Sequence, residues 1–94
     1  MDLKQSFYEK LDFDVANIAS RNRLKYYIEY TFNEIGAYDK MFRIVYSYDN
    51  YHFAFEIDFR LYCEMLDSDI VYSGVINKLE KEVQNAFGSS TSQN

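Results

Sequence analysis

The clearest pattern in the sequence is a two-residue alternation of apolar and polar positions between residues 42 and 61. Its apolar members are Phe42, Ile44, Tyr46, Tyr48, Tyr51, Phe53, Phe55, Ile57, Phe59 and Leu61. Because successive side chains of a strand point to opposite faces, this alternation predicts two half-buried strands. Asp49 and Asn50 separate the two runs and tolerate a tight turn, so the sequence predicts a β-hairpin.

The register of this hairpin is also predictable, because a turn at residues 49 and 50 fixes which positions lie opposite one another. On the apolar face the pairs are Tyr46 with Phe53, Ile44 with Phe55, and Phe42 with Ile57. On the polar face the pairs are Arg43 with Glu56, and Asp39 with Arg60. Both polar pairs join opposite charges, and a slip of one residue would scatter both patterns.

A first helix is predicted over residues 3–12. Its apolar residues recur every four positions: Leu3, Phe7 and Leu11. Ser6 and Glu9 match a capping box, which leaves a later start at Phe7 open.

A second helix is predicted over residues 20–36. Its apolar stripe consists of Leu24, Ile28, Phe32 and Ile35. Tyr26 and Tyr30 then fall on the opposite, exposed side of the helix. The helix is not extended back toward residue 15, because this would bury Asn17 and Arg21.

A final helix is predicted from Asp69 to Phe87, ended by Gly88. Its apolar face consists of Val75, Ile76, Leu79, Val83, Ala86 and Phe87. Residues 70–73 can form either its first turn or a short third strand. Residues 88–94 contain no apolar side chain and are expected to form a flexible C-terminal tail.

These elements predict one globular domain over residues 1–87 of the α+β class. The expected fold is an antiparallel β-hairpin packed against two to three α-helices in the order α-α-β-β-α. A small three-stranded sheet is the variant in which residues 70–73 are a strand. The second and final helices are expected to cover the phenylalanine-rich face. Both edges of such a sheet can accept a strand, and a homodimer through strand edges is one outcome.

The net charge narrows the choice of partners. Fifteen Asp and Glu against ten Lys and Arg give a net charge of −5. Direct binding to nucleic acid or to an acidic membrane surface is therefore not expected, whereas a protein with a basic surface is favoured. The single cysteine gives no sign of an oxidising compartment, and no apolar stretch approaches the length of a membrane span. A cytoplasmic protein without membrane attachment is expected.

No residue pattern specifies a catalytic site. His52 is the only histidine and has Ser47 opposite it in the predicted hairpin, without an acidic partner. Cys63 lacks the companions of a zinc site and is expected to be a small buried residue near the end of the strand. The three glycines lie too far apart for a phosphate-binding loop. We therefore expect no enzymatic activity and no cofactor.

Four acidic pairs have the spacing of two residues that metal sites use. They are Asp12 with Asp14, Glu56 with Asp58, Asp67 with Asp69, and Glu80 with Glu82. None belongs to a calcium-binding loop, and Asp67 and Asp69 suit the start of the final helix. No metal site is predicted.

The aromatic content points to an exposed binding surface. Ten tyrosines and eight phenylalanines are more rings than a core of this size encloses. Tyrosine is favoured at protein interfaces, and carboxylates attract basic partners. The candidate partner-binding residues are Tyr26, Glu29, Tyr30, Asp49, Tyr51, Glu56 and Asp58.

In size, acidity and lack of a catalytic motif, the chain resembles small phage-encoded inhibitors of host defence, including anti-CRISPR and anti-restriction proteins. The resemblance is one of composition over the whole chain and includes no motif. It implies a non-enzymatic protein that binds and inhibits a basic, nucleic-acid-handling protein, with carboxylates in the positions of phosphates. The alternative is a structural or assembly protein that associates with itself through sheet edges and tyrosine surfaces.

Overall fold

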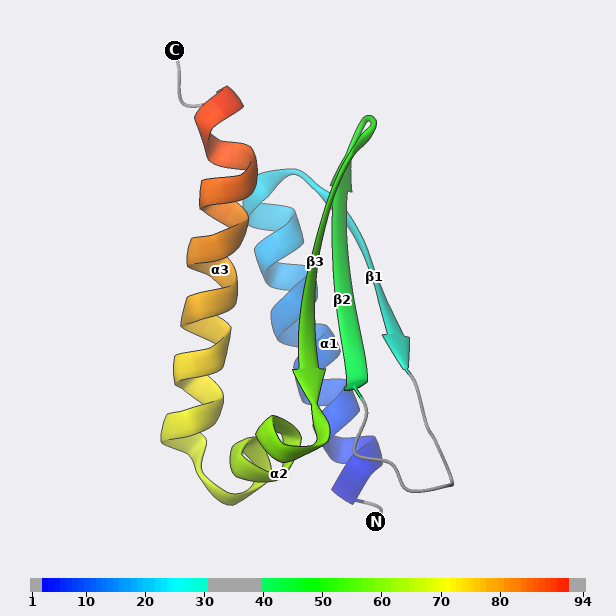
Figure 1. Ribbon diagram of the computed structural model, residues 1–94, viewed down its shortest axis with the longest axis vertical. Helices are drawn as coiled ribbons and strands as arrows, with labels where there is room; N and C mark the ends of the chain where they lie inside the picture. Colours follow the sequence, from blue (N-terminus) through cyan, green and yellow to red (C-terminus); the bar gives the residue numbers. More distant parts are fainter. Residues whose placement is uncertain (1–2, 31–39, 92–94) are drawn as a thin grey trace.

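The computed structural model describes residues 3–30 and 40–91, with side chains for residues 6–29 and 42–88 (Figure 1). The fold is α+β, as predicted, and the elements follow in the order α-β-β-β-α-α. They are α1 (Leu3–Asn22), β1 (Lys25–Tyr30), β2 (Lys40–Tyr48), β3 (Tyr51–Asp58), α2 (Phe59–Asp67) and α3 (Asp69–Thr91). None of these helices is long and apolar enough to cross a membrane.

The three strands form one antiparallel sheet in the order β1-β2-β3. Helices α1 and α3 pack against one face of it, here called the inner face, and α2 lies at the end of the sheet opposite the hairpin turn (Figure 1). The other face, the outer face, carries no helix in the described part of the chain. The core lies between the inner face and the helices, and its largest fully buried side chains include Tyr46, Phe42 and Leu11.

The predicted hairpin is confirmed. Strands β2 and β3 pair Tyr46 with Phe53, Ile44 with Phe55, Phe42 with Ile57, and Arg43 with Glu56. Asp39 of the second predicted charge pair lies outside the described residues, and its predicted partner Arg60 belongs to α2 and not to the strand. The strand ends at Asp58, whose carboxylate accepts a hydrogen bond of 2.8 Å from the backbone N–H of Leu61. This side chain caps α2. Residues 59–61, which the alternation assigned to the strand, are therefore the first turn of a helix.

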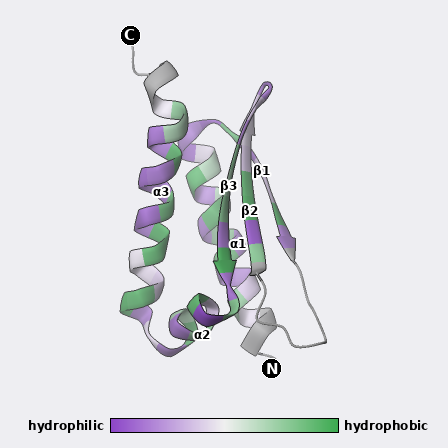
Figure 2. Cartoon of the chain, in the orientation of Figure 1, coloured by the Kyte–Doolittle hydropathy of each residue, from purple (hydrophilic) through white to green (hydrophobic). Residues whose placement is uncertain are grey.

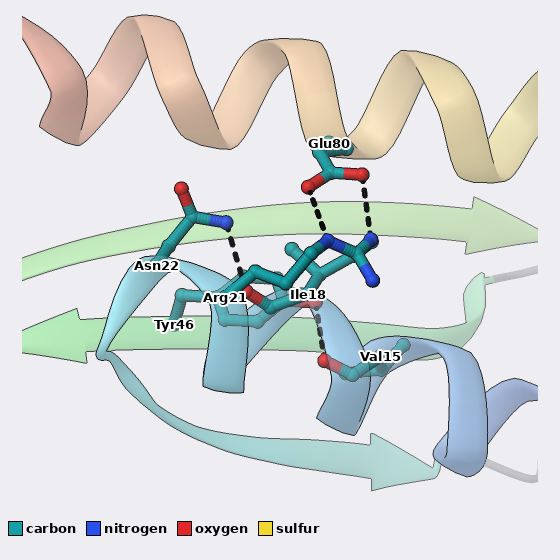
Figure 3. A network of polar contacts seen from close by, with 6 residues as sticks. All are labelled: Val15, Ile18, Arg21, Asn22, Tyr46 and Glu80. Atoms are coloured by element: carbon teal, nitrogen blue, oxygen red, sulfur yellow. Dashed lines mark hydrogen bonds and ion pairs between the residues drawn. The ribbon is translucent and has the colours of Figure 1, made fainter.

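The first helix is longer than predicted, since α1 continues to Asn22. Its buried line, Phe7, Leu11, Val15 and Ile18, keeps a spacing of three to four residues throughout. Burial of Arg21 was the reason for not extending the second predicted helix back toward residue 15. Arg21 instead belongs to α1, where it is exposed and its guanidinium contacts Glu80 of α3 (Figure 3). The helix ends where Arg23 adopts a φ of 58° and the backbone N–H of Leu24 bonds to the carbonyl of Ala19.

The second predicted helix is wrong, because residues 25–30 form strand β1. Leu24, Tyr26 and Ile28 are half-buried, whereas Lys25, Tyr27 and Glu29 are exposed. A spacing of four fits both the helical repeat and twice the strand repeat, so Leu24 and Ile28 could not distinguish the two. Pairing with β2 and the aromatic content of the segment favour the strand. The predicted residues Phe32, Ile35 and Gly36 lie outside the described residues.

The C-terminal half contains two helices where one was predicted. Helix α2 directly follows β3, and residues 70–73 form the first turns of α3 instead of a third strand. Helix α3 runs through Gly88 to Thr91, beyond the predicted end at Phe87. Residues 92–94 of the predicted tail lie outside the described residues.

Candidate protein-binding site

Three tyrosine hydroxyls hold α1 in place. Tyr46 of β2 donates a hydrogen bond of 2.9 Å to the carbonyl of Val15 (Figure 3). Tyr26 of β1 donates one of 3.0 Å to Asp12, and Tyr72 of α3 donates one of 2.6 Å to Asp14. These bonds tie one helix to two strands and to α3.

These three tyrosine hydroxyls stay protonated at neutral pH. Burial raises the pKa of Tyr46 well above its ordinary value. Burial, and then the hydrogen bonds to Asp14 and Asp12, likewise raise the pKa values of Tyr72 and Tyr26. The hydroxyls therefore remain hydrogen-bond donors, and the two carboxylates of the Asp12 and Asp14 pair serve different tyrosines.

Two of the predicted partner-binding residues have structural roles. Tyr26 is half-buried on the inner face and bonded to Asp12, although it was predicted to be exposed. Asp58 caps α2. Both side chains are therefore committed within the fold.

The remaining predicted residues do not form one surface. Glu29 and Glu56 are on the outer face, where Arg43 lies between them at 3.1 Å and 3.9 Å. Asp49 is exposed in the hairpin turn, with a φ of 58°. Tyr51 is exposed at the far end of the inner face, with its ring 5.8 Å from that of Phe87. The side chain of Tyr30 lies outside the described residues.

The side chains with reactive groups do not converge. His52 is exposed opposite Ser47, as predicted. Cys63 is exposed on α2, so the expectation that it is buried is wrong. The described residues contain no cluster of three or more histidine, cysteine and carboxylate side chains that could hold a metal ion.

A cleft of about 380 Å³ opens beside the end of α1. Its lining includes Arg21, Arg23, Tyr48 and Phe87. Arg21 already forms a two-point contact with Glu80, at 2.7 Å and 3.0 Å. This hydrogen bonding raises the pKa of Arg21 and lowers that of Glu80, which keeps both groups charged.

A different surface combines exposed acids with exposed apolar side chains. It lies where α2 meets α3 and is here called the acidic corner: Glu64, Leu66, Asp67, Asp69 and Ile70. Ile70 is 85% exposed and Leu66 is 42% exposed. The ribbon at the start of α3 has the green colour of hydrophobic residues in Figure 2.

The carboxylates of the acidic corner are almost without intramolecular partners. The side chain of Asp69 is 99% exposed, and its distance to the Nζ of Lys10 is 4.0 Å. No ion pair or side-chain hydrogen bond joins Glu64 or Asp67 to another described residue. Residues 61–77 contain these three acids and no lysine or arginine. No cation follows these acids within the same stretch of chain, and of the three only Asp69 contacts Lys10 of α1.

Sequence reasoning missed this site because it did not predict α2. Asp67 and Asp69 were assigned to the start of one helix, which is correct for Asp69. The available signal was the absence of basic residues between Arg60 and Lys78, together with two aliphatic residues beside the acids. The corner between two helices, which exposes both aliphatic side chains, is a property of the tertiary fold.

Comparisons of the chain with protein-family models, with curated proteins and with solved structures find no match.

Proposed function

We propose that this protein is a non-enzymatic interaction protein that uses the acidic corner to bind a basic protein surface. The observation that supports this proposal is the exposure of Ile70 and Leu66 among three carboxylates with almost no intramolecular partner. Burial of a largely exposed isoleucine by a partner contributes about 1.5 to 3 kcal/mol to the free energy of binding. The carboxylates select partners that carry lysine and arginine around an apolar depression.

The chemistry of the acidic corner indicates the class of partner. Proteins that handle nucleic acids present basic surfaces to phosphates, and carboxylates can occupy the same positions. A protein that covers such a surface blocks access of the nucleic acid. Inhibition of a nucleic-acid-handling protein, as suggested by the composition of the chain, is therefore the activity we propose.

Selection of peptides from a random library on the immobilised protein tests this function. The proposal predicts enriched peptides that contain lysine or arginine next to large apolar residues, with an affinity that falls as salt concentration rises. The corner variant E64Q/D67N/D69N is expected to bind them about tenfold or more weakly.

A matched control removes the same number of charges elsewhere. The variant D49N/E56Q/E82Q changes acids of the turn, the outer face and α3. It is expected to bind the selected peptides as the wild type does. Enrichment of neutral or acidic peptides, or equal losses in both variants, would contradict the proposal.

A second candidate function is self-association through a sheet edge. The observation that favours it is the edge position of β1, which has no second neighbouring strand among the described residues. An unpaired strand edge offers backbone donors and acceptors to another chain.

A further inference from the structure

The edge strand β1 has a sequence that complements itself when reversed. From residue 25 to residue 29 it reads Lys-Tyr-Tyr-Ile-Glu, with a cation at one end and an anion at the other. In Figure 1, β1 forms one margin of the sheet, and α3 packs beside the strand at the opposite margin.

We infer that β1 pairs antiparallel with β1 of a second copy of this chain, with Tyr27 on the two-fold axis. This inference rests on the second candidate function, self-association, and not on the acidic corner. In this register Lys25 lies opposite Glu29 of the second copy, and the same contact occurs twice because the interface is symmetric. Tyr26 lies opposite Ile28, and Tyr27 lies opposite its own equivalent.

The faces of the sheet support this register. Lys25, Tyr27 and Glu29 are exposed on the outer face, and Tyr26 and Ile28 are half-buried toward the inner face. An antiparallel register centred on a residue joins outer positions to outer positions and inner to inner, so both faces continue across the axis. The result is a six-stranded sheet with α1 and α3 of both copies on one side.

Neighbouring registers lack this charge match between residues of β1 itself. Centring the pair on Tyr26 sets Lys25 opposite Tyr27 and brings Glu29 opposite Arg23, which precedes the strand and has a φ of 58°. Centring it on Ile28 sets Glu29 opposite Tyr27 and Lys25 opposite residue 31, which is uncharged and lies outside the described residues. Directly opposed unlike charges stabilise an antiparallel sheet, and directly opposed like charges destabilise it. The register on Tyr27 is therefore the favoured one.

Lys25 and Glu29 are both able to form the ion pair between the two copies. Lys25 forms no ion pair with another described residue, whereas Glu29 contacts Arg43 at 3.1 Å on its own chain. Glu29 can therefore lie between Arg43 and Lys25 of the second copy. Because one short strand edge buries less than a standard interface, we expect a dissociation constant in the micromolar range, of about 1 to 100 μM.

Sedimentation of single-charge variants tests the inference. The wild type is expected to change from monomer to dimer between about 1 and 500 μM. Lys25→Glu creates two Glu–Glu contacts and Glu29→Lys creates two Lys–Lys contacts, so each is expected to weaken the dimer about tenfold or more. In an equimolar mixture both contacts become complementary again, and the dimer returns.

The mixture distinguishes pairing in this register from general charge effects. A wild type that stays monomeric throughout the range, variants that dimerise like the wild type, or a mixture without recovery would each overturn the inference. Circular dichroism checks that every variant is folded. If Glu29→Lys does not fold, Glu29→Gln replaces it, and its mixture with Lys25→Glu must still dimerise more tightly than Lys25→Glu by itself.

The same experiment is independent of the acidic corner. The variant E64Q/D67N/D69N is expected to keep the wild-type dimerisation, because its substitutions lie on α2 and α3. Conversely, Lys25→Glu is expected to keep the affinity for basic peptides. Failure of one proposal therefore leaves the other intact.

Discussion

Two groups of acidic residues in this molecule differ in what their carboxylates contact. In the first group, Asp12, Asp14, Asp58 and Glu80 accept hydrogen bonds from tyrosines, from a helix terminus or from an arginine. In the second group, Glu64, Asp67 and Asp69 of the acidic corner have at most one contact of 4.0 Å. The first group maintains the fold, and the second is available to a partner.

This difference shows that net charge does not locate a binding surface. A carboxylate that already satisfies an intramolecular donor loses that bond when it binds elsewhere, which offsets what it gains. A carboxylate in water gives up hydrogen bonds to water when it binds, but no bond within the fold is broken. Substitutions in the first group should therefore lower stability, and substitutions in the second should change binding and leave stability nearly constant.

The largest effect on stability is expected at Asp14. Replacing it with alanine leaves the buried Tyr72 hydroxyl without its acceptor, which costs about 1 to 3 kcal/mol. Urea denaturation measures this loss. Tyr72→Phe removes the donor and is expected to cost less, because the Asp14 carboxylate is half-buried and can be hydrated. Equal stability of Asp14→Ala and the wild type would remove Asp14 from the structural group.

A smaller effect is expected at Asp58, which caps α2. Asp58→Ala is expected to lower the free energy of unfolding by about 1 kcal/mol, whereas Asp58→Asn retains a capping oxygen and most of the stability. Thermal denaturation of both variants distinguishes the contribution of the capping hydrogen bond to stability from that of the negative charge. An equal loss in both would show that the charge, and not the hydrogen bond, is what matters.

A smaller effect again is expected from pH at Glu80. The hydrogen bond from Arg21 holds the pKa of Glu80 below its ordinary value of 4.5 in the folded state. A depressed folded pKa means that the stabilisation is complete above the unfolded pKa and is lost as pH falls through the folded pKa. Denaturation curves from pH 6 to pH 3 should therefore show a steeper loss for the wild type than for Glu80→Gln. Parallel profiles would mean that the ion pair does not contribute.

The smallest effect on stability is expected in the acidic corner. The variant E64Q/D67N/D69N should unfold within about 0.5 kcal/mol of the wild type. Asp67 at the end of α2 is unfavourable for the helix dipole and Asp69 at the start of α3 is favourable, so their effects oppose each other. A loss above about 1 kcal/mol would place these acids in the structural group.

The part of the fold that could be predicted was the part whose contacts join residues close together in the sequence. Strands β2 and β3 were predictable because two alternating runs meet at a turn and Arg43 then opposes Glu56. Strand β1 was not, because the spacing of Leu24 and Ile28 also fits a helix and the pairing with β2 depends on distant residues. The predicted α+β class is still correct, because replacing one helix with a third antiparallel strand leaves both helices and a sheet in the fold.

The candidate site was less predictable than the fold. Tyr26 was predicted to be exposed, yet its hydroxyl reaches Asp12 of α1, a contact that no local pattern signals. Asp58 was expected to be an exposed carboxylate on a strand, whereas the chain enters α2 directly after it and its side chain caps that helix. Ile70 and Leu66 were not distinguishable from core residues, since only the corner between α2 and α3 exposes them.

The central claim is that the acidic corner is where a basic partner binds. The most direct measurement is a titration of the ¹⁵N-labelled protein with a selected basic peptide, followed by backbone amide shifts in NMR spectra. The account predicts that the shifts concentrate in residues 63–71 and spare the outer face of the sheet. Shifts concentrated on the outer face, in the hairpin turn or in the cleft at the end of α1 would contradict it.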